Sequence, residues 1–425
     1  IIGLGEMMNF LGVFLSDEKM HAEMAETRVA GKVIGGHYAS LDLGLPFHGY
    51  VAGGPEDDHE GTRLEDAVNR VRQGMKAMLR YGSGWHDVAA QIKAVTELGL
   101  DPRHFLLVTD DAHPGTLVHD GHMDRVVRHT IQQGVDPITV IQMATLNTAE
   151  HFRVAQDVGQ IAPGRFADIL LVSDLEAFEV DMVIAKGKKV AEAGKLLMDI
   201  PPFEYPPEVK TSIHLGRELR VEDFTFSSPT NGLVEVNVIG VIENQAHTRH
   251  LRLQLEAMDG KIETDLTKDL AKIALIERHR GTGEVQVGLV HGFGFNQACA
   301  IGSTVAHDSH HMIVVGTDDA NMAMAANELG RVGGGQIVVR DGEVIALVEL
   351  PIAGLMSNER AEIVAEKAVG VLEGLRACGC KLNNANMQLS LLALVVIPEL
   401  RISDKGLVDV TKFEIIPSVE TLKET

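Results

Sequence analysis

Residues that can bind a metal ion lie at the ends of short apolar runs or just ahead of a helix at four places in the first 111 residues. The segments are GLGEMMN with Glu6, VIGGHYAS with His37, EDDHEGT with His59, and LLVTDDAHP with Asp110 and Asp111. Imidazole and carboxylate together suit Zn, Fe or Mn, and a bridging carboxylate suits two ions about 3.5–4 Å apart. Such ions lower the pKa of bound water toward about 7. One such residue alone is more often a cap or a satisfied polar group, but the four together predict a divalent metal site.

The adjacent carboxylates of Asp110 and Asp111 require compensation. Two like charges at the end of a buried strand raise each other's pKa, which costs stability unless a metal, a basic substrate or solvent offsets it. We interpret one aspartate as a metal ligand and the other as a group that positions substrate or handles protons.

The surrounding pattern predicts the elements that position these residues. From residue 1 to about 152, apolar runs such as 31–37 and 104–111 alternate with amphipathic stretches, and 64–82 has the apolar spacing of one helix. This alternation predicts a parallel α/β architecture with its site at the carboxyl ends of the strands. A complete (β/α)8 barrel needs about 250 residues, so we expect this chain, which opens with IIGLGEMMNF, to be a piece of a longer product.

The rest of the chain has a different pattern. Residues 159–197 hold short β-rich runs separated by PG, SD and KGK, which predict a small sheet. The proline-rich stretch 200–209 predicts a boundary. Beyond 213, strands at 232–242 and 336–350 accompany a helical pattern at 358–379.

Composition excludes several classes of function. A formal net charge of −22 argues against a nucleic-acid partner, and no apolar run approaches the roughly 20 residues of a membrane span. The three cysteines, Cys299, Cys378 and Cys380, are too few for a disulfide framework, which favours a reduced cytoplasmic setting. A homodimer is the expected assembly.

Three further motifs have weaker functional interpretations. The run HDSHHMIVVG (307–316) fits no standard zinc spacing and leads into a strand, so we interpret it as a loop over the barrel mouth or a domain-packing contact. The stretch GRVGGGQIVV (330–339) lacks the Lys-Ser/Thr ending of a phosphate loop and predicts a turn. CGC (378–380) predicts packing at a helix end.

The chain resembles bacterial adenine deaminases of the amidohydrolase superfamily. The motifs that carry the resemblance are GLGEMMNF, DHE (58–60), TDDAHP with GHMD, ATLNTAEHF, GQIAPGRFADILLV, KIALIERHRGTG, STVAHDSHHMIVVG and LPIAGLMS. The last three are typical of adenine deaminases rather than of amidohydrolases at large. The resemblance implies the later part of a (β/α)8 metal-dependent hydrolase barrel over 1–155, a β-sandwich segment and linker over 156–212, and a C-terminal α+β domain over 213–425.

The resemblance also implies roles for the metal-ligating residues. Glu6 is expected to bridge a divalent metal pair, with Mn or Fe favoured and Zn possible. His37 and His59 are expected as ligands from two successive strands, and Asp110 as a metal ligand that also shuttles a proton.

The implied reaction is attack of hydroxide on C6 of adenine, which gives hypoxanthine and ammonia. It requires a base and an acid, and Glu60 is the expected acid/base partner beside Asp110. Ser83, Asp111 and His113 are the expected substrate-binding residues, although His113 suits a solvated loop equally well.

Departures from the family pattern leave the substrate and the activity open. The His-x-His pair of the first barrel strand is missing, so we expect this chain alone to be weakly active or inactive. HYASLDLG, Tyr81 and Ala112 stand where HAPGLSG and charged residues were expected, which makes an N6-substituted adenine a credible substrate. The barrel ligands also suit a metal-dependent cyclic amidase, and the missing pair of histidines suits a degenerate scaffold or binding protein.

Overall fold

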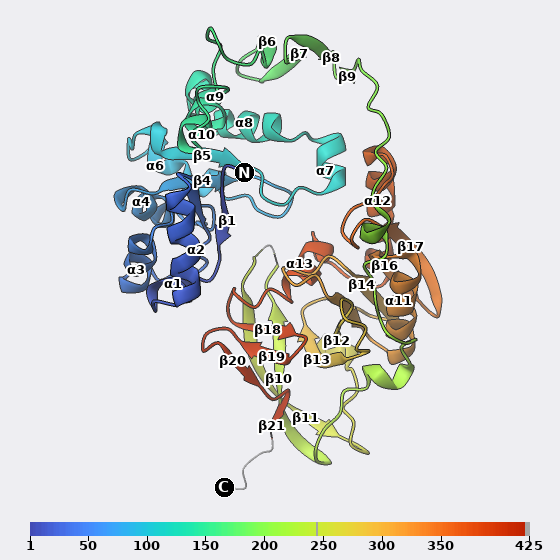
Figure 1. Ribbon diagram of the computed structural model, residues 1–425. Helices are drawn as coiled ribbons and strands as arrows, with labels where there is room; N and C mark the ends of the chain where they lie inside the picture. The colour runs from blue at the N-terminus through green and yellow to red at the C-terminus, as the bar shows by residue number, and fades with distance from the viewer. Residues whose placement is uncertain (244, 421–425) are drawn as a thin grey trace. The chain divides into compact units, whose positions relative to one another are not determined.

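The computed structural model describes residues 1–243 and 245–420 and divides into two compact units, Ile1–Pro202 and Phe203–Thr425. The division lies within the proline-rich stretch 200–209. Figure 1 shows the first unit in blue to green and the second in green to red. Mixed helices and strands in both units give an α/β fold.

Unit 1 is built on short parallel strands. Strand β1 pairs with β2, and β3, β4 and β5 pair in that order, all in parallel. The backbone N–H of Glu56 donates to the carbonyl of Ile34 at 2.8 Å, which connects the two groups of strands. The strands are β1 (Gly3–Met7), β2 (Val33–Gly36), β3 (Asp57–Asp58), β4 (Lys76–Arg80) and β5 (Phe105–Val108).

Helices alternate with these strands, so the predicted parallel α/β architecture is confirmed for this unit. They are α1 (Phe10–Phe14), α2 (Glu18–Val29), α3 (Leu45–Gly53), α4 (Leu64–Arg72), α5 (Val88–Gln91), α6 (Lys93–Thr96), η1 (Pro102–His104), α7 (Pro114–His119), α8 (Met123–Gln132), α9 (Pro137–Ala144) and α10 (Leu146–His151).

The prediction of one helix over 64–82 is wrong. Helix α4 ends at Arg72, and Gly74 adopts a positive φ of 86°, which a glycine tolerates and which ends the helix. Strand β4 then begins at Lys76 and lies between β3 and β5, with Leu79 fully buried. The apolar residues of 75–79 therefore face a sheet core, whose burial outweighs their helical spacing.

The predicted small sheet is confirmed as four antiparallel strands in sequence order, at the green end of unit 1 in Figure 1. They are β6 (Ile169–Asp174), β7 (Glu179–Ala185), β8 (Lys188–Glu192) and β9 (Lys195–Leu196).

Unit 2 centres on a nine-stranded mixed sheet in the order β11-β10-β13-β12-β15-β14-β16-β17, with β21 also paired to β10. A three-stranded sheet, β18-β19-β20, accompanies it. The strands are β10 (Gly232–Val241), β11 (Thr248–Ala257), β12 (Leu270–Ile276), β13 (Val285–His291), β14 (Cys299–Ser303), β15 (Met312–Gly316), β16 (Gly335–Arg340), β17 (Glu343–Glu349), β18 (Leu400–Ser403), β19 (Gly406–Asp409), β20 (Glu414–Ile416) and β21 (Val419–Glu420).

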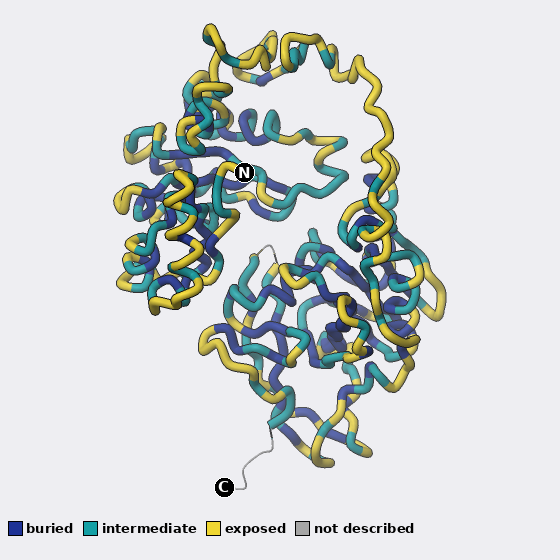
Figure 2. Tube along the Cα trace, viewed as in Figure 1, coloured by how far each residue is buried: buried dark blue, intermediate teal, exposed yellow. Residues whose placement is uncertain are grey.

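The helices of unit 2 cover both faces of its large sheet. Met312 and Val314 of β15 pack with α11, whereas Ile313 and Val315 pack with α12, as the two-residue period of a strand requires. Figure 2 shows the resulting buried interior in dark blue. The helices are η2 (Pro207–Lys210), η3 (Val221–Phe224), η4 (Leu266–Lys268), α11 (Asp319–Val332), α12 (Ala361–Ala377) and α13 (Ala385–Leu391).

Two sequence interpretations in unit 2 are confirmed. The glycine-rich stretch is a turn, because Gly333 in the left-handed conformation ends α11 just before β16. Cys378 caps the end of α12, and it is buried like Cys380. Within residues 1–243 and 245–420, no helix has both the length and the apolar character needed to cross a membrane.

Candidate functional site

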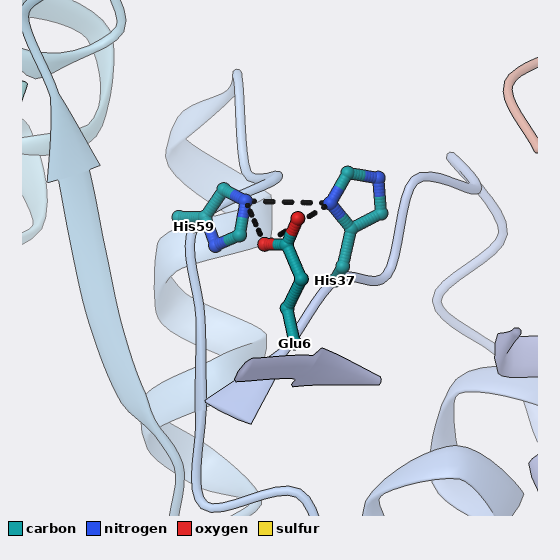
Figure 3. Close-up of side chains that lie close together, drawn as sticks. All are labelled: Glu6, His37 and His59. Atoms are coloured by element: carbon teal, nitrogen blue, oxygen red, sulfur yellow. Dashed lines mark hydrogen bonds and ion pairs between the residues drawn. The ribbon is translucent and has the colours of Figure 1, made fainter. Parts of the chain in front are cut away.

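Three side chains that could hold a metal ion converge from three successive strands of unit 1. Glu6 lies on β1, His37 follows β2 and His59 follows β3, and Figure 3 shows the carboxylate between the two rings. Glu6 Oε2 lies 2.9 Å from His59 Nε2 and 3.6 Å from His37 Nδ1, and the two imidazole nitrogens are 3.3 Å apart. The structure thus brings together three residues that the sequence predicted as ligands.

The electrostatics of this group reflect mutual attraction. Burial raises the pKa of Glu6, but hydrogen bonds with His37 and His59 outweigh it and hold that pKa well below its usual value. Burial lowers the pKa of His59, but the carboxylates of Glu6 and Glu60 raise it to about 9. The pKa of His37 is also raised, because the charge of Glu60 and the hydrogen bond to Glu6 outweigh burial.

The donor set fits a divalent metal ion. Two imidazole nitrogens and a carboxylate oxygen face one another, an arrangement that a cation at their centre stabilises. His37 presents Nδ1 to the group, and its buried Nε2 has no hydrogen-bond partner.

A second group adjoins the first. His59, Glu60 and Asp110 also lie close enough together to hold a cation, and Asp110 follows the end of β5 with a positive φ of 56°. The carboxylates of Glu60 and Asp110 both accept a hydrogen bond from the buried guanidinium of Arg80, at the end of β4. Burial raises the pKa of Glu60, but the charges of Arg80 and the two histidines outweigh it and lower that pKa to about 2.

Arg80 and Trp85 are the residues that sequence reasoning missed. The predicted helix over 64–82 includes Arg80, and a lone tryptophan gives no signal in the sequence. The guanidinium of Arg80 lies 4.9 Å from the centre of the Trp85 ring. A strand assignment for 76–80 would have been the signal, because it puts an arginine at the strand end where Glu6 and Asp110 also lie.

Asp58 holds the loops that carry the ligands. Its fully buried carboxylate accepts hydrogen bonds from the backbone N–H groups of Tyr38 and Glu60 and pairs with the buried Arg70. Tyr38 follows His37 and Glu60 follows His59 in the chain, so one carboxylate fixes both ligand loops.

Tyr50 connects the first two ligand strands. Its buried hydroxyl donates to the carbonyl of Met7 at 2.9 Å and accepts from the backbone N–H of His37 at 2.8 Å. Because Met7 follows Glu6, these two bonds set the spacing between Glu6 and His37.

The predicted substrate residues come from two neighbouring loops, Ser83 from the loop after β4 and Asp111 and His113 from the loop after β5. The hydroxyl of Ser83 accepts from the backbone N–H of His113 at 2.7 Å and donates to Thr116 Oγ1 at 2.9 Å. The Nδ1 atom of His113 accepts from the N–H of Gly115 as the cap of α7. Among the described residues, neither Asp111 nor His113 belongs to the two donor groups, so their substrate roles stay predictions.

The ring of Tyr81 packs against residues outside the two donor groups. Its ring stacks on His129 at 3.8 Å between ring centres and lies 4.0 Å from the guanidinium carbon of Arg125. Since Arg80 points to the donor groups, strand alternation sends Tyr81 to the opposite face, toward α8. The effect of Tyr81 on the choice of substrate stays a prediction.

Comparisons with known proteins identify the family. The model of the adenine deaminase C-terminal domain matches residues 245–414, and that of the amidohydrolase family matches 86–190. An adenine deaminase of Mesorhizobium japonicum is 62% identical over 97% of this chain and 69% of its own length. Adenine deaminase 3 of Rhizobium meliloti is 61% identical over 97% of this chain and 70% of its own. The chain belongs to the adenine deaminase family.

The site is divided with respect to these matches. Asp110 lies within residues 86–190, which match the amidohydrolase family model. Glu6, His37 and His59 lie before this matched segment. Among solved structures, a β-aspartyl dipeptidase of Fervidobacterium islandicum AW-1 covers 47% of this chain and 59% of its own at 18% identity, with a TM-score of 0.37. A likeness of this degree is too weak to indicate a function.

Proposed function

We propose that this protein hydrolyses adenine to hypoxanthine and ammonia. The observation that carries the proposal is the convergence of Glu6, His37 and His59 next to the carboxylates of Glu60 and Asp110. Its support is membership of a family whose members at about 60% identity are named adenine deaminases.

In this proposal, Glu6, His37, His59 and Asp110 hold divalent metal. A bound ion would lower the pKa of water toward about 7 and so supply a nucleophile at neutral pH. We favour a pair of Mn or Fe ions, with Zn possible, because imidazole and carboxylate suit all three metals.

The chain's own carboxylates would manage the protons. As water adds to C6 of adenine, Asp110 takes one of its protons. Glu60 has a pKa of about 2 and enters ionised, so it takes the second proton of the added water from the hydroxyl on C6 and delivers it to the leaving nitrogen. The proton that Asp110 took passes to N1 of the ring, which leaves both carboxylates ionised again. The C6–N6 bond then breaks, the nitrogen leaves as ammonia, and the oxygen of water stays on C6.

The finer architecture belongs to the same proposal. The five parallel strands of unit 1 would form the later half of a (β/α)8 barrel, with the β6–β9 sheet as part of a β-sandwich. We further propose a cytoplasmic homodimer that acts on a small purine base.

The test measures metal content and ammonia release together. The full-length gene product, freed of metal, receives Mn²⁺, Fe²⁺ or Zn²⁺ and is assayed with adenine and, in parallel, with N6-methyladenine. Metal-dependent ammonia release from adenine supports the proposal. Bound metal without adenine turnover overturns the substrate assignment, and turnover of N6-methyladenine alone would replace it with the N6-substituted purine.

A further inference from the structure

Arg80 is a buried cation surrounded by carboxylates. Its side chain is 2% exposed. Its Nη1 atom donates to Asp110 Oδ2 at 2.9 Å and to Glu60 Oε1, and its Nε atom donates to Asp87 Oδ2 at 2.9 Å. The ring of Trp85 covers the guanidinium plane at 4.9 Å, a cation–π contact.

The geometry fixes two carboxylates relative to each other. Glu60 follows β3 and Asp110 follows β5, so they come from strands on either side of β4. A single nitrogen of Arg80 binds both, which sets their separation. Asp87 holds Nε and thereby orients the rigid guanidinium fork toward the other two carboxylates.

A comparison with Arg70 separates this arrangement from an ordinary structural ion pair. Arg70 is equally buried, but it donates to the backbone carbonyls of Asp66 and Tyr38 as well as to Asp58. Arg80 donates to three carboxylates, and two of these, Glu60 and Asp110, belong to a donor group that can hold a cation. Its bonds therefore end at the proposed site rather than at the backbone.

We propose that Arg80 is a positioning residue that holds Glu60 and Asp110 in the arrangement that proton transfer requires. Asp87 and Trp85 hold Arg80 in turn. This inference rests on the proposed function, since it assigns a task to the groups that would move protons during adenine hydrolysis.

The central experiment uses Arg80→Lys, which keeps the charge and loses the fork. We expect kcat to fall about 100-fold, because small displacements of reacting groups have effects of this size, while KM changes by less than about threefold. Metal content should stay at the wild-type level, because Glu6, His37 and His59 remain. Asp87→Asn should lower kcat about tenfold by the same route.

Two further variants separate positioning from folding. Arg80→Met removes the charge and leaves the carboxylates of Glu60, Asp87 and Asp110 without their shared cation, so it is destabilising, and any folded fraction should be less active than Arg80→Lys. Arg125→Lys is the matched control, since Arg125 also lies over an aromatic ring but donates to the carbonyls of Tyr81 and Gly82. Its kcat should stay within about twofold of wild type. Wild-type kcat in Arg80→Lys, or metal loss in proportion to kcat, would overturn the inference.

Trp85 provides a readout that does not require turnover. It is the single tryptophan of the chain, so its emission reports on the Arg80 environment. Addition of Zn²⁺ to the metal-free protein should change that emission in wild type and change it several-fold less in Arg80→Lys. Equal changes in both would overturn the positioning role, even if wild type hydrolyses no adenine. Absence of adenine turnover in the metal-loaded full-length wild-type protein, with unequal emission changes, would instead refute the proposed function.

Discussion

Two regions of this protein contain histidines next to carboxylates, but among the described residues only the first brings three donor atoms together. In unit 1, Glu6, His37 and His59 present three donor atoms within 3.6 Å of one another. In unit 2, the histidine loops comprise 277–283 and 304–311 and contain His279, His307, His310 and His311 with Glu277. Among the described residues, the histidine loops contribute no group of three donors that could hold a metal ion.

The histidine loops use their polar atoms to hold their own backbone. Glu277 accepts from the backbone N–H groups of His279, Arg280 and Thr282. The Nδ1 atom of His310 accepts from the N–H of Ala306, and His279 Nε2 bonds the carbonyl of Ser309 at 2.8 Å. These side-chain atoms make hydrogen bonds to the backbone of the loops that join antiparallel strands.

The difference follows from topology. Parallel strands all end at the same edge, so one residue just past each strand suffices to build a site from distant parts of the chain. Antiparallel strands β12 and β15 are joined to their neighbours by loops that must satisfy their own backbone groups. The number of histidines in a segment is thus a poor guide to metal binding, and their placement on a sheet edge is a better one.

The largest expected effect comes from His59→Ala. This change removes the donor that lies 2.9 Å from Glu6 and borders both donor groups. Bound metal should fall to a small fraction of the wild-type content, and ammonia release from adenine should be lost with it. Metal analysis after dialysis tests this, with the exposed His48→Ala as control. Wild-type metal content in His59→Ala would remove the distinction between the two regions.

Asp110→Asn should separate metal binding from proton transfer. The amide keeps the shape of the side chain but cannot accept a proton, so kcat should fall about 10²–10⁴-fold with the fold retained. Metal content should remain, because three other ligands are present. The neighbouring Asp111→Asn should act mainly on KM. A kcat for Asp110→Asn near that of wild type would refute the proton-shuttle role.

Tyr50→Phe should produce an intermediate effect through the spacing of the ligand strands. Loss of the hydroxyl leaves the buried carbonyl of Met7 and the N–H of His37 without a partner, which costs about 1–3 kcal/mol. Metal affinity should drop about tenfold, as for other residues that orient ligands. Tyr38→Phe is the control, since the Tyr38 hydroxyl donates to the loop carbonyl of Asp42 at 2.6 Å rather than joining the two ligand strands. Equal metal affinity in the two variants would contradict the spacing role.

Asp66 lies outside the two donor groups, so its replacement should change the free energy of unfolding without changing a metal ligand. Its carboxylate is 4% exposed and accepts hydrogen bonds from the backbone N–H groups of Thr62 and Arg63 and from the Arg63 guanidinium. Burial raises its pKa, but these bonds outweigh burial and lower it. Because folding lowers the pKa of this carboxyl from 3.8, the ionised side chain stabilises the fold at pH values above 3.8. This stabilisation is lost as the pH falls from 3.8 through the lower pKa of the folded state.

Asp66→Asn should therefore destabilise unit 1 by about 1–2 kcal/mol at pH 7 and by less at pH 3. Denaturant unfolding at the two pH values measures the difference. Asp101→Asn is the control, because its pair with Arg103 is largely exposed to solvent and should contribute little. A pH-independent difference for Asp66→Asn would mean that its charge does not stabilise the fold.

The sequence predicted the site better than the elements around it. Glu6, His37 and Asp110 could be found because each follows an apolar run, and His59 because it stands between two acidic residues just ahead of a helix. These local signals remain readable when the exact helix and strand limits are wrong. Arg80 could not be found in the same way. Arg80 lies on a strand whose apolar residues have the spacing of a helix. Its role also depends on carboxylates that lie 20 and 30 residues away in the chain. Long-range pairing of this kind is decided by packing, which spacing along one segment does not record.

The smallest expected effect is that of His307→Ala in the histidine loops. The Nδ1 atom of His307 lies 3.5 Å from the carboxylate of its neighbour Asp308 and belongs to no three-donor group of the described residues. Metal content should therefore equal that of wild type, measured on the same preparations as His59→Ala. Because the two variants make the same chemical change, their difference reports only on where the histidine lies. A fall in bound metal for His307→Ala would mean that these loops also hold a cation, and that antiparallel loops can build the kind of site that we assign to parallel strand ends.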